Sequence, residues 1–96
     1  MKILIDGATA SDATKQVFIL GLRHFTNNSV PAIKTAGLGT GDSVIIYESV
    51  NDVWQAAQTL DESTTSTIIR SVGKYAVDIT MATAGPASVG LDASYE

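Results

Sequence analysis

The stretch Lys74-Tyr75-Ala76-Val77-Asp78-Ile79-Thr80 decides the fold class of this chain. Its large apolar side chains, Tyr75, Val77 and Ile79, alternate with small or polar residues. A period of two places one face of a strand toward a core and the other toward water. The stretch therefore predicts a half-buried strand of an antiparallel sheet.

Short apolar runs of the same kind recur along the whole chain. Gly, Asn, Asp and Ser clusters separate them, and the spacing of about ten residues is typical of a sandwich or a barrel. We predict an all-β fold, an antiparallel β-sandwich or β-barrel-like domain of about seven short strands. The expected strands are residues 2–5, 16–20, 43–49, 52–57, 66–71, 74–80 and 87–93.

The segments between these runs indicate how the strands connect. Asn51-Asp52 tolerates positive φ and predicts a β-hairpin between 43–49 and 52–57. Ser71-Val72-Gly73 predicts a second hairpin, between 66–71 and 74–80, and Gly85-Pro86 predicts a reversal before the last strand. The polar segments 6–15 and 23–29 are predicted to be loops, with a short helix from residue 11 or 12 as the alternative to the first.

The length of 96 residues allows one domain, 1–96, with one core, and residues 1–15 are a candidate N-terminal arm. The apolar start Ile3-Leu4-Ile5 is too short for a signal peptide. No apolar run approaches the roughly 20 residues that cross a bilayer. We therefore expect synthesis in the cytoplasm and no membrane partner.

Charge and cysteine content exclude several classes of function. The net charge is −4 and the six basic residues are scattered, so nucleic acid and anionic lipid are not expected partners. The chain contains no cysteine, which excludes disulfides, thiolate nucleophiles and cysteine-based metal sites.

The residues that could carry chemistry do not form a catalytic or metal-binding set. His24 is the only histidine, and we expect it to be exposed in a loop, without the ligands of a zinc site or the partners of a triad. Gly37, Gly39 and Gly41 predict a turn before a strand, because no helix or Lys-Ser/Thr pair follows as in a phosphate-binding loop. Asp61-Glu62 is expected in a solvated loop. We predict no catalytic residue, metal or cofactor, and a protein that is not an enzyme.

One region is the candidate interface or ligand surface: Val44, Ile45, Ile46, Tyr47 and Trp54. The run Val44-Ile45-Ile46-Tyr47 is apolar at every position, as expected of a strand covered on both faces or lying beneath a partner subunit. Exposed Tyr47 and Trp54 could stack on sugar rings. Aromatic residues more often fill the core, and we expect that place for Trp54 above all.

Residues 30–93 carry a series of features in a recognisable order. A strand begins at Gly41-Asp42-Ser43-Val44, a hairpin closes on Trp54, a strand begins Gly73-Lys74-Tyr75, and the turn Thr83-Ala84-Gly85-Pro86 precedes the last strand. In this order the chain resembles small β-rich virion proteins of tailed bacteriophages, of the head decoration type. Residues 1–29 lie outside the resemblance, as an arm, a swapped strand or an extra edge.

The resemblance implies a structural protein of the virion, made in the host cytoplasm and bound to the outer surface of the capsid. It implies a homotrimer whose partner is the major capsid protein, with no catalytic residues to transfer. Two alternatives remain. One is a carbohydrate- or cell-surface-binding β-sandwich module of a tail fibre or a hydrolase, and the other is an inhibitor that acts through an open strand edge.

Overall fold

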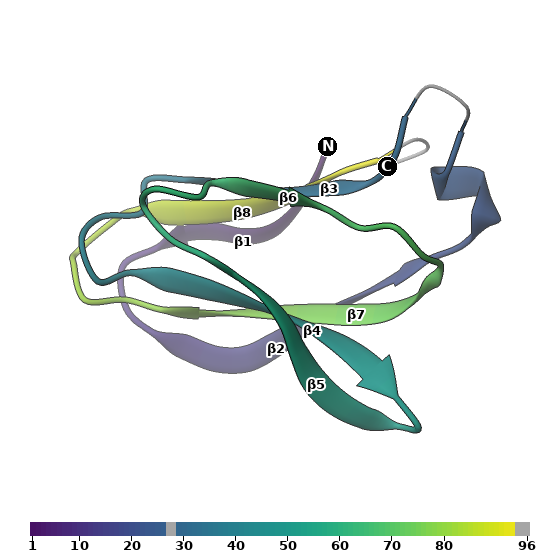
Figure 1. Ribbon diagram of the computed structural model, residues 1–96. Coiled ribbons are helices and arrows are strands. Elements are labelled where there is room, and N and C mark those ends of the chain that lie inside the picture. The colour runs from purple at the N-terminus through teal and green to yellow at the C-terminus, as the bar shows by residue number, and fades with distance from the viewer. Residues whose placement is uncertain (27–28, 94–96) are drawn as a thin grey trace.

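Two antiparallel four-stranded sheets face each other in the computed structural model, which describes residues 1–26 and 29–93 (Figure 1). Sheet A has the order β1 (Lys2–Ala8), β8 (Ala87–Asp92), β3 (Ala32–Ala36) and β6 (Ser66–Ile68). Sheet B has the order β2 (Asp12–Leu20), β7 (Gly73–Thr80), β4 (Ser43–Val50) and β5 (Val53–Leu60). The all-β prediction is confirmed, and the architecture is a sandwich of eight strands.

The order of the strands shows how the chain is wound. Each of the first four strands pairs with the strand equally far from the other end of the series: β1 with β8, β2 with β7, β3 with β6, and β4 with β5. A long hairpin has this pairing when its tip is at β4–β5 and the successive strands of each arm alternate between the two sheets. It is the topology of an eight-stranded jelly roll, a fold that hosts many functions.

The predicted second hairpin is wrong. β6 pairs with β3 in sheet A, whereas β7 lies in sheet B, so the segment between them carries the chain from one sheet to the other. The backbone N–H of Ile69 donates to the carbonyl oxygen of Pro31 at 2.9 Å and extends the pairing with β3. β3 itself is absent from the predicted strands, because only Ile33 is buried among its five residues.

The N-terminal segment is part of both sheets. β1 pairs with β8 and β2 with β7, so residues 1–15 contribute strands and do not form a free arm. Most of the predicted loop 6–15 is strand, and only residues 9–11 connect β1 with β2. The start of β2 is polar because it lies at an exposed edge, where no side chain needs to face the core. The predicted loop 23–29 includes Asn27 and Asn28, which lie outside the described residues.

The predicted hairpin between β4 and β5 is confirmed. Asn51 and Asp52 both have positive φ, 52° and 64°, as a two-residue turn that matches the twist of its strands requires. The register shifts by one residue between Ile46 and Tyr47, which leaves Ala57 as an extra residue in β5. Such a bulge bends a hairpin. Figure 1 shows the tip of this hairpin extending away from the rest of the sandwich.

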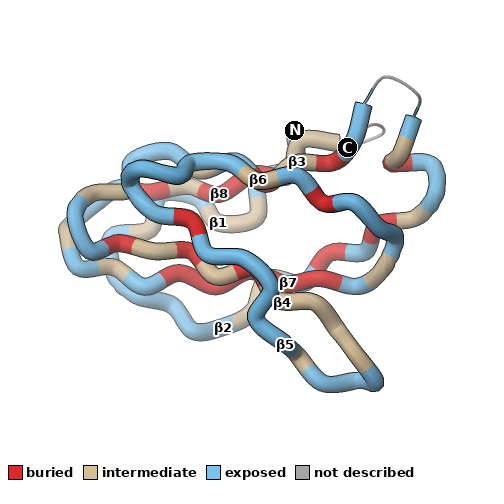
Figure 2. The backbone as a smooth tube through the Cα atoms, in the orientation of Figure 1, coloured by how far each residue is buried: buried red, intermediate tan, exposed pale blue. Residues whose placement is uncertain are grey.

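The core lies between the two sheets; its buried residues come from six of the eight strands, and β1 packs partly buried residues against them (Figure 2). Phe18 of β2 stacks on Tyr75 of β7 with ring centroids 5.7 Å apart, and the Tyr75 hydroxyl donates to the carbonyl oxygen of Ser71 at 2.7 Å. Trp54 is not a core residue. The buried core residues are Phe18, Leu20, Ile33, Val44, Ile46, Leu60, Ile69, Tyr75, Val77, Ile79, Ala87, Val89 and Leu91.

A buried carboxylate joins two loops at one end of the sandwich. One oxygen of Asp42 accepts from the backbone N–H groups of Ala82 and Thr83, at 2.7 and 2.9 Å. The other accepts from the backbone N–H of Gly39 at 2.8 Å and from the Thr83 hydroxyl. These hydrogen bonds, the one from the Thr83 hydroxyl foremost, lower the pKa of Asp42 to about 2. The loop before β4 is thereby tied to the loop between β7 and β8.

The glycine-rich segment before β4 is a turn, as predicted. Gly37 has a φ of +82°, and a Cβ at this position would overlap the carbonyl oxygen of Pro86. Glycine is needed here both for the backbone conformation and for the close approach of the neighbouring loop.

Candidate functional site

The candidate site is the outer face of sheet B, the side of that sheet turned away from the core. We define it by ten residues whose side chains point outward from four adjacent strands. The register joins Val17, Ala76, Tyr47 and Ala56 into one row across the sheet, with Ile19 opposite Lys74. The ten residues are Lys15, Val17, Ile19, Ile45, Tyr47, Trp54, Ala56, Lys74, Ala76 and Asp78.

The predicted surface residues divide between two faces. Val44 and Ile46 are 0% and 1% exposed and point into the core, so they do not belong to the candidate surface. Ile45, Tyr47 and Trp54 lie on the outer face of sheet B and are half-buried. In the apolar run 44–47, alternate side chains therefore point into the core, and the other two point to the outer face of sheet B.

Much of this face is apolar and open to solvent. Val17 and Ile19 are 47% and 67% exposed, so no described part of the chain covers them. Two lysines and one aspartate lie on the face, giving it a charge of +1, whereas the whole chain carries −4. Large apolar side chains exposed on one face of a small domain make that face a candidate interaction site, and the local positive charge favours an acidic partner surface.

Lys15, Tyr47 and Asp78 form a polar network across β2, β4 and β7. The Tyr47 hydroxyl donates to an Asp78 oxygen at 2.9 Å, and the Lys15 Nζ lies 3.8 Å from the same oxygen. The Lys15 Nζ also lies 4.4 Å from the centroid of the Tyr47 ring, a cation–π contact. Burial, followed by the hydrogen bond and the charge of Asp78, raises the pKa of Tyr47 above its ordinary 10.0. The network fixes Tyr47 and covers one side of its ring.

Replacing Tyr47 by phenylalanine tests this network. The variant loses the hydrogen bond to Asp78, and we expect the free energy of unfolding to fall by about 1 kcal/mol. An ultraviolet titration of tyrosine ionisation should lose a phase above pH 10, because the tyrosine that deprotonates late is gone. Loss of a phase centred at or below pH 10 would contradict the assignment.

Trp54 is more accessible than expected of the only tryptophan in a small domain. Its side chain is half-buried on β5, and the Lys74 Nζ lies 5.7 Å from the ring centroid. Within residues 1–26 and 29–93, Lys74 forms no ion pair with a carboxylate. A flat ring beside an unneutralised ammonium group could contact an apolar surface or a sugar that carries a negative charge.

His24 is buried, and the prediction of an exposed loop histidine is wrong. It ends the 3-10 turn η1 (Leu22–His24), is 2% exposed, and its Nδ1 accepts from the backbone N–H of Gly21 at 2.9 Å. In the described part of the chain, no three His, Asp or Glu residues are placed to hold a metal ion.

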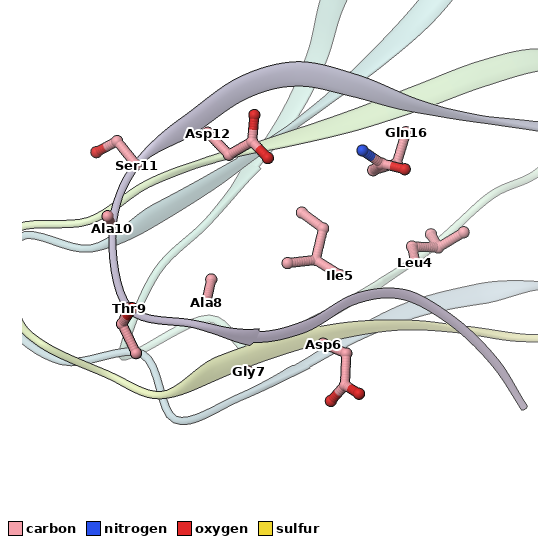
Figure 3. A pocket seen from close by; sticks show the side chains of 10 residues that line it. All are labelled: Leu4, Ile5, Asp6, Gly7, Ala8, Thr9, Ala10, Ser11, Asp12 and Gln16. Atoms are coloured by element: carbon pink, nitrogen blue, oxygen red, sulfur yellow. The ribbon is translucent and has the colours of Figure 1, made fainter.

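A cavity of about 500 Å³ lies where β1 and β2 separate at the side of the sandwich (Figure 3). The side chains of Ile5, Asp12 and Gln16 lie in the gap between the strands, whereas that of Asp6 points away from it. An Asp12 oxygen accepts from the backbone N–H of Thr14 at 2.8 Å, which caps the start of β2. One carboxylate and one amide form no catalytic constellation in this cavity.

Asp61 lies in a loop, as predicted. One of its oxygens accepts from the backbone N–H groups of Ser63 and Thr64, both at 2.9 Å, so the carboxylate is used to shape the turn.

Over the residues that the structure describes, no helix is long and apolar enough to cross a membrane. No protein-family model matches the chain, and no curated protein matches it.

Proposed function

We propose that this chain is a non-catalytic structural protein of a tailed-bacteriophage virion, which decorates the outer surface of the capsid. The outer face of sheet B would be the surface that binds the major capsid protein. The observation that carries this proposal is the open apolar face that includes Val17 and Ile19, two aliphatic residues with no cover from the described chain. The resemblance of residues 30–93 to decoration proteins supplies the kind of partner.

The physical state of this face suits binding to another protein. Tyr47 is held before binding by Asp78 and Lys15, so ordering it on association costs little side-chain entropy. Tyr47 and Trp54 are residue types enriched at the centres of protein interfaces. The +1 charge of the face would favour an acidic region of the capsid surface.

Binding to empty capsids tests the proposal. Purified chain is mixed with empty heads of the phage whose genome carries the gene, and the bound fraction is measured after sedimentation. Ile19→Asp introduces a charge on the outer face of sheet B, at a side chain exposed enough to leave the fold intact. We expect at least a ~30-fold loss of affinity, because the new charge would be buried without a partner in the contact.

Ile68→Asp is the matched control. Ile68 lies in β6 of sheet A and is also well exposed, so the substitution adds the same charge on the opposite side of the sandwich. Binding should stay within ~3-fold of the unchanged chain, since surface substitutions outside an interface have small effects. Equal losses for both variants, or no binding by the unchanged chain, would contradict the proposal.

Carbohydrate binding is the second candidate function, and Trp54 is the observation that favours it. Its ring could stack on a sugar, and Lys74 beside it could bind a carboxylate or sulfate group of that sugar. Tyr47 suits this role less, because Lys15 covers its ring. A glycan array in which the chain retains acidic glycans and Trp54→Ala does not would support this function. An array without retained glycans would remove it.

A further inference from the structure

The edge strands of the two sheets differ in how many features oppose pairing with a strand of another chain. An edge strand exposes unpaired backbone N–H and C=O groups, and charges, proline, shortness or irregularity protect it. β6 has three residues. β1 contains Lys2 and Asp6 and two register shifts, and β2 contains Asp12 and Lys15 and one register shift.

β5 is the edge strand with the fewest features that oppose pairing with another chain. Its eight residues, Val-Trp-Gln-Ala-Ala-Gln-Thr-Leu, include no charged residue, no proline and no glycine. Only Leu60 among them is buried. The bulge at Ala57 is its one irregularity. β5 pairs with β4 on one side and with no other described strand, and its hairpin extends away from the sandwich, where a second strand can reach it (Figure 1).

We propose that β5 pairs antiparallel with β5 of a second copy of this chain, which joins two copies of sheet B into one sheet. Twofold pairing places β5 residues opposite β5 residues, and because none is charged, no like charges meet. With the twofold axis beside Gln55, this residue lies opposite its own copy, and the two amides can each donate and accept a hydrogen bond across the axis. Val53, 59% exposed, adds apolar area to the contact.

This β5 pairing does not depend on the proposal of capsid binding. If the chain does bind capsids, the pairing would strengthen its binding to the capsid surface. A twofold pair through β5 makes the two outer faces of sheet B continuous. Each pair would then present the proposed docking face twice, and a second contact from the same particle raises avidity without any new interaction. The pair also differs in mass from the homotrimer that the resemblance implies, so the two assemblies are distinguishable in solution.

Gln55→Lys is the variant that tests the pairing. Gln55 lies directly opposite Glu48 of β4, so a lysine gains an opposite charge across the hairpin and the single chain should keep its stability. At the same time two lysines would approach each other across the proposed twofold axis. Thr14→Lys is the matched control, because Thr14 is an exposed residue of the other edge strand of sheet B.

Static light scattering over a concentration series gives the first result. We expect the unchanged chain and Thr14→Lys to reach twice the chain mass of 10.0 kDa, and Gln55→Lys to need at least ~10-fold higher concentration to do so. A second readout is the emission of Trp54, the only tryptophan, which should shift to the blue as pairs form. The proposal would be overturned if the unchanged chain is monomeric at every concentration or forms an assembly of another mass. Equal effects of the two lysine variants would also overturn it.

Discussion

Truncating Ile46 to alanine is expected to lower the free energy of unfolding by about 2–5 kcal/mol, whereas the same change at the adjacent Ile45 should cost about 1 kcal/mol. The two residues have the same side chain and neighbouring positions in β4. Ile46 is buried between the sheets, so its truncation leaves a cavity, while Ile45 lies half-buried on the outer face of sheet B. Urea denaturation measures both losses.

The aspartate variants of the same pair sharpen the test. Ile46→Asp should abolish folding, because a carboxylate between the sheets has no partner. Ile45→Asp should leave a folded chain with impaired binding to its partner, although the chain will be less stable because the new carboxylate lies directly opposite Asp78. Loss of all structure in Ile45→Asp would place that residue in the core and would remove it from the proposed docking face.

The buried carboxylate of Asp42 should make stability fall in acid. Its pKa is about 2 in the folded chain, below the ordinary value of 3.8, so the folded state binds its proton less readily than the unfolded chain does. The resulting stabilisation is complete above pH 4 and is lost as the pH falls from about 4 to about 2. Asp42→Asn keeps the shape but replaces one oxygen with an NH2 group, which cannot accept from the backbone N–H of Gly39.

We therefore expect Asp42→Asn to be much less stable than the unchanged chain at pH 7, with the difference narrowing between pH 4 and pH 2. Asp92→Asn is the control. The pKa of Asp92 is also lowered, through its hydrogen bond and ion pair with Lys34 at 2.7 Å, but this pair is exposed on sheet A and should contribute little. Thermal unfolding at several pH values measures both. A loss for Asp42→Asn that does not change with pH would contradict the assignment.

The alternation of residues predicted the strands well where each strand has one face in the core. In β7 and β8 the large apolar residues all point inward, and both strands were predicted within one residue of their ends. The β4–β5 turn was predictable because Asn and Asp adopt positive φ more readily than most residues. β3 escaped prediction because a single buried residue, Ile33, gives no alternation to detect.

Local sequence patterns could not predict which strands pair with each other. Residues 66–71 and 74–80 look like the arms of a hairpin, yet β6 and β7 lie in opposite sheets, and the residues between them do not indicate this. The same limit applies to Asp42, whose partners Ala82 and Thr83 lie forty residues away in sequence.

The candidate site was predicted in part. Tyr47 and Ile45 were identified from an apolar run, but the run does not show which residues face the core. Val17 and Ile19 were missed, because an apolar edge strand resembles a core strand until its neighbours are placed. Trp54 was expected in the core by its size, and it lies on the outer face instead because its position in β5, opposite Ser49, turns its side chain away from sheet A.

Lysine footprinting tests the docking face most directly. Lys74 lies on the outer face of sheet B and Lys34 on sheet A, so the two report on opposite sides of the sandwich. Acetylation of each lysine is measured by mass spectrometry for the free chain and for the chain bound to empty heads. The account predicts that binding protects Lys74 and Lys15 and leaves Lys34 as reactive as in the free chain. Protection of Lys34 with Lys74 unchanged would contradict it.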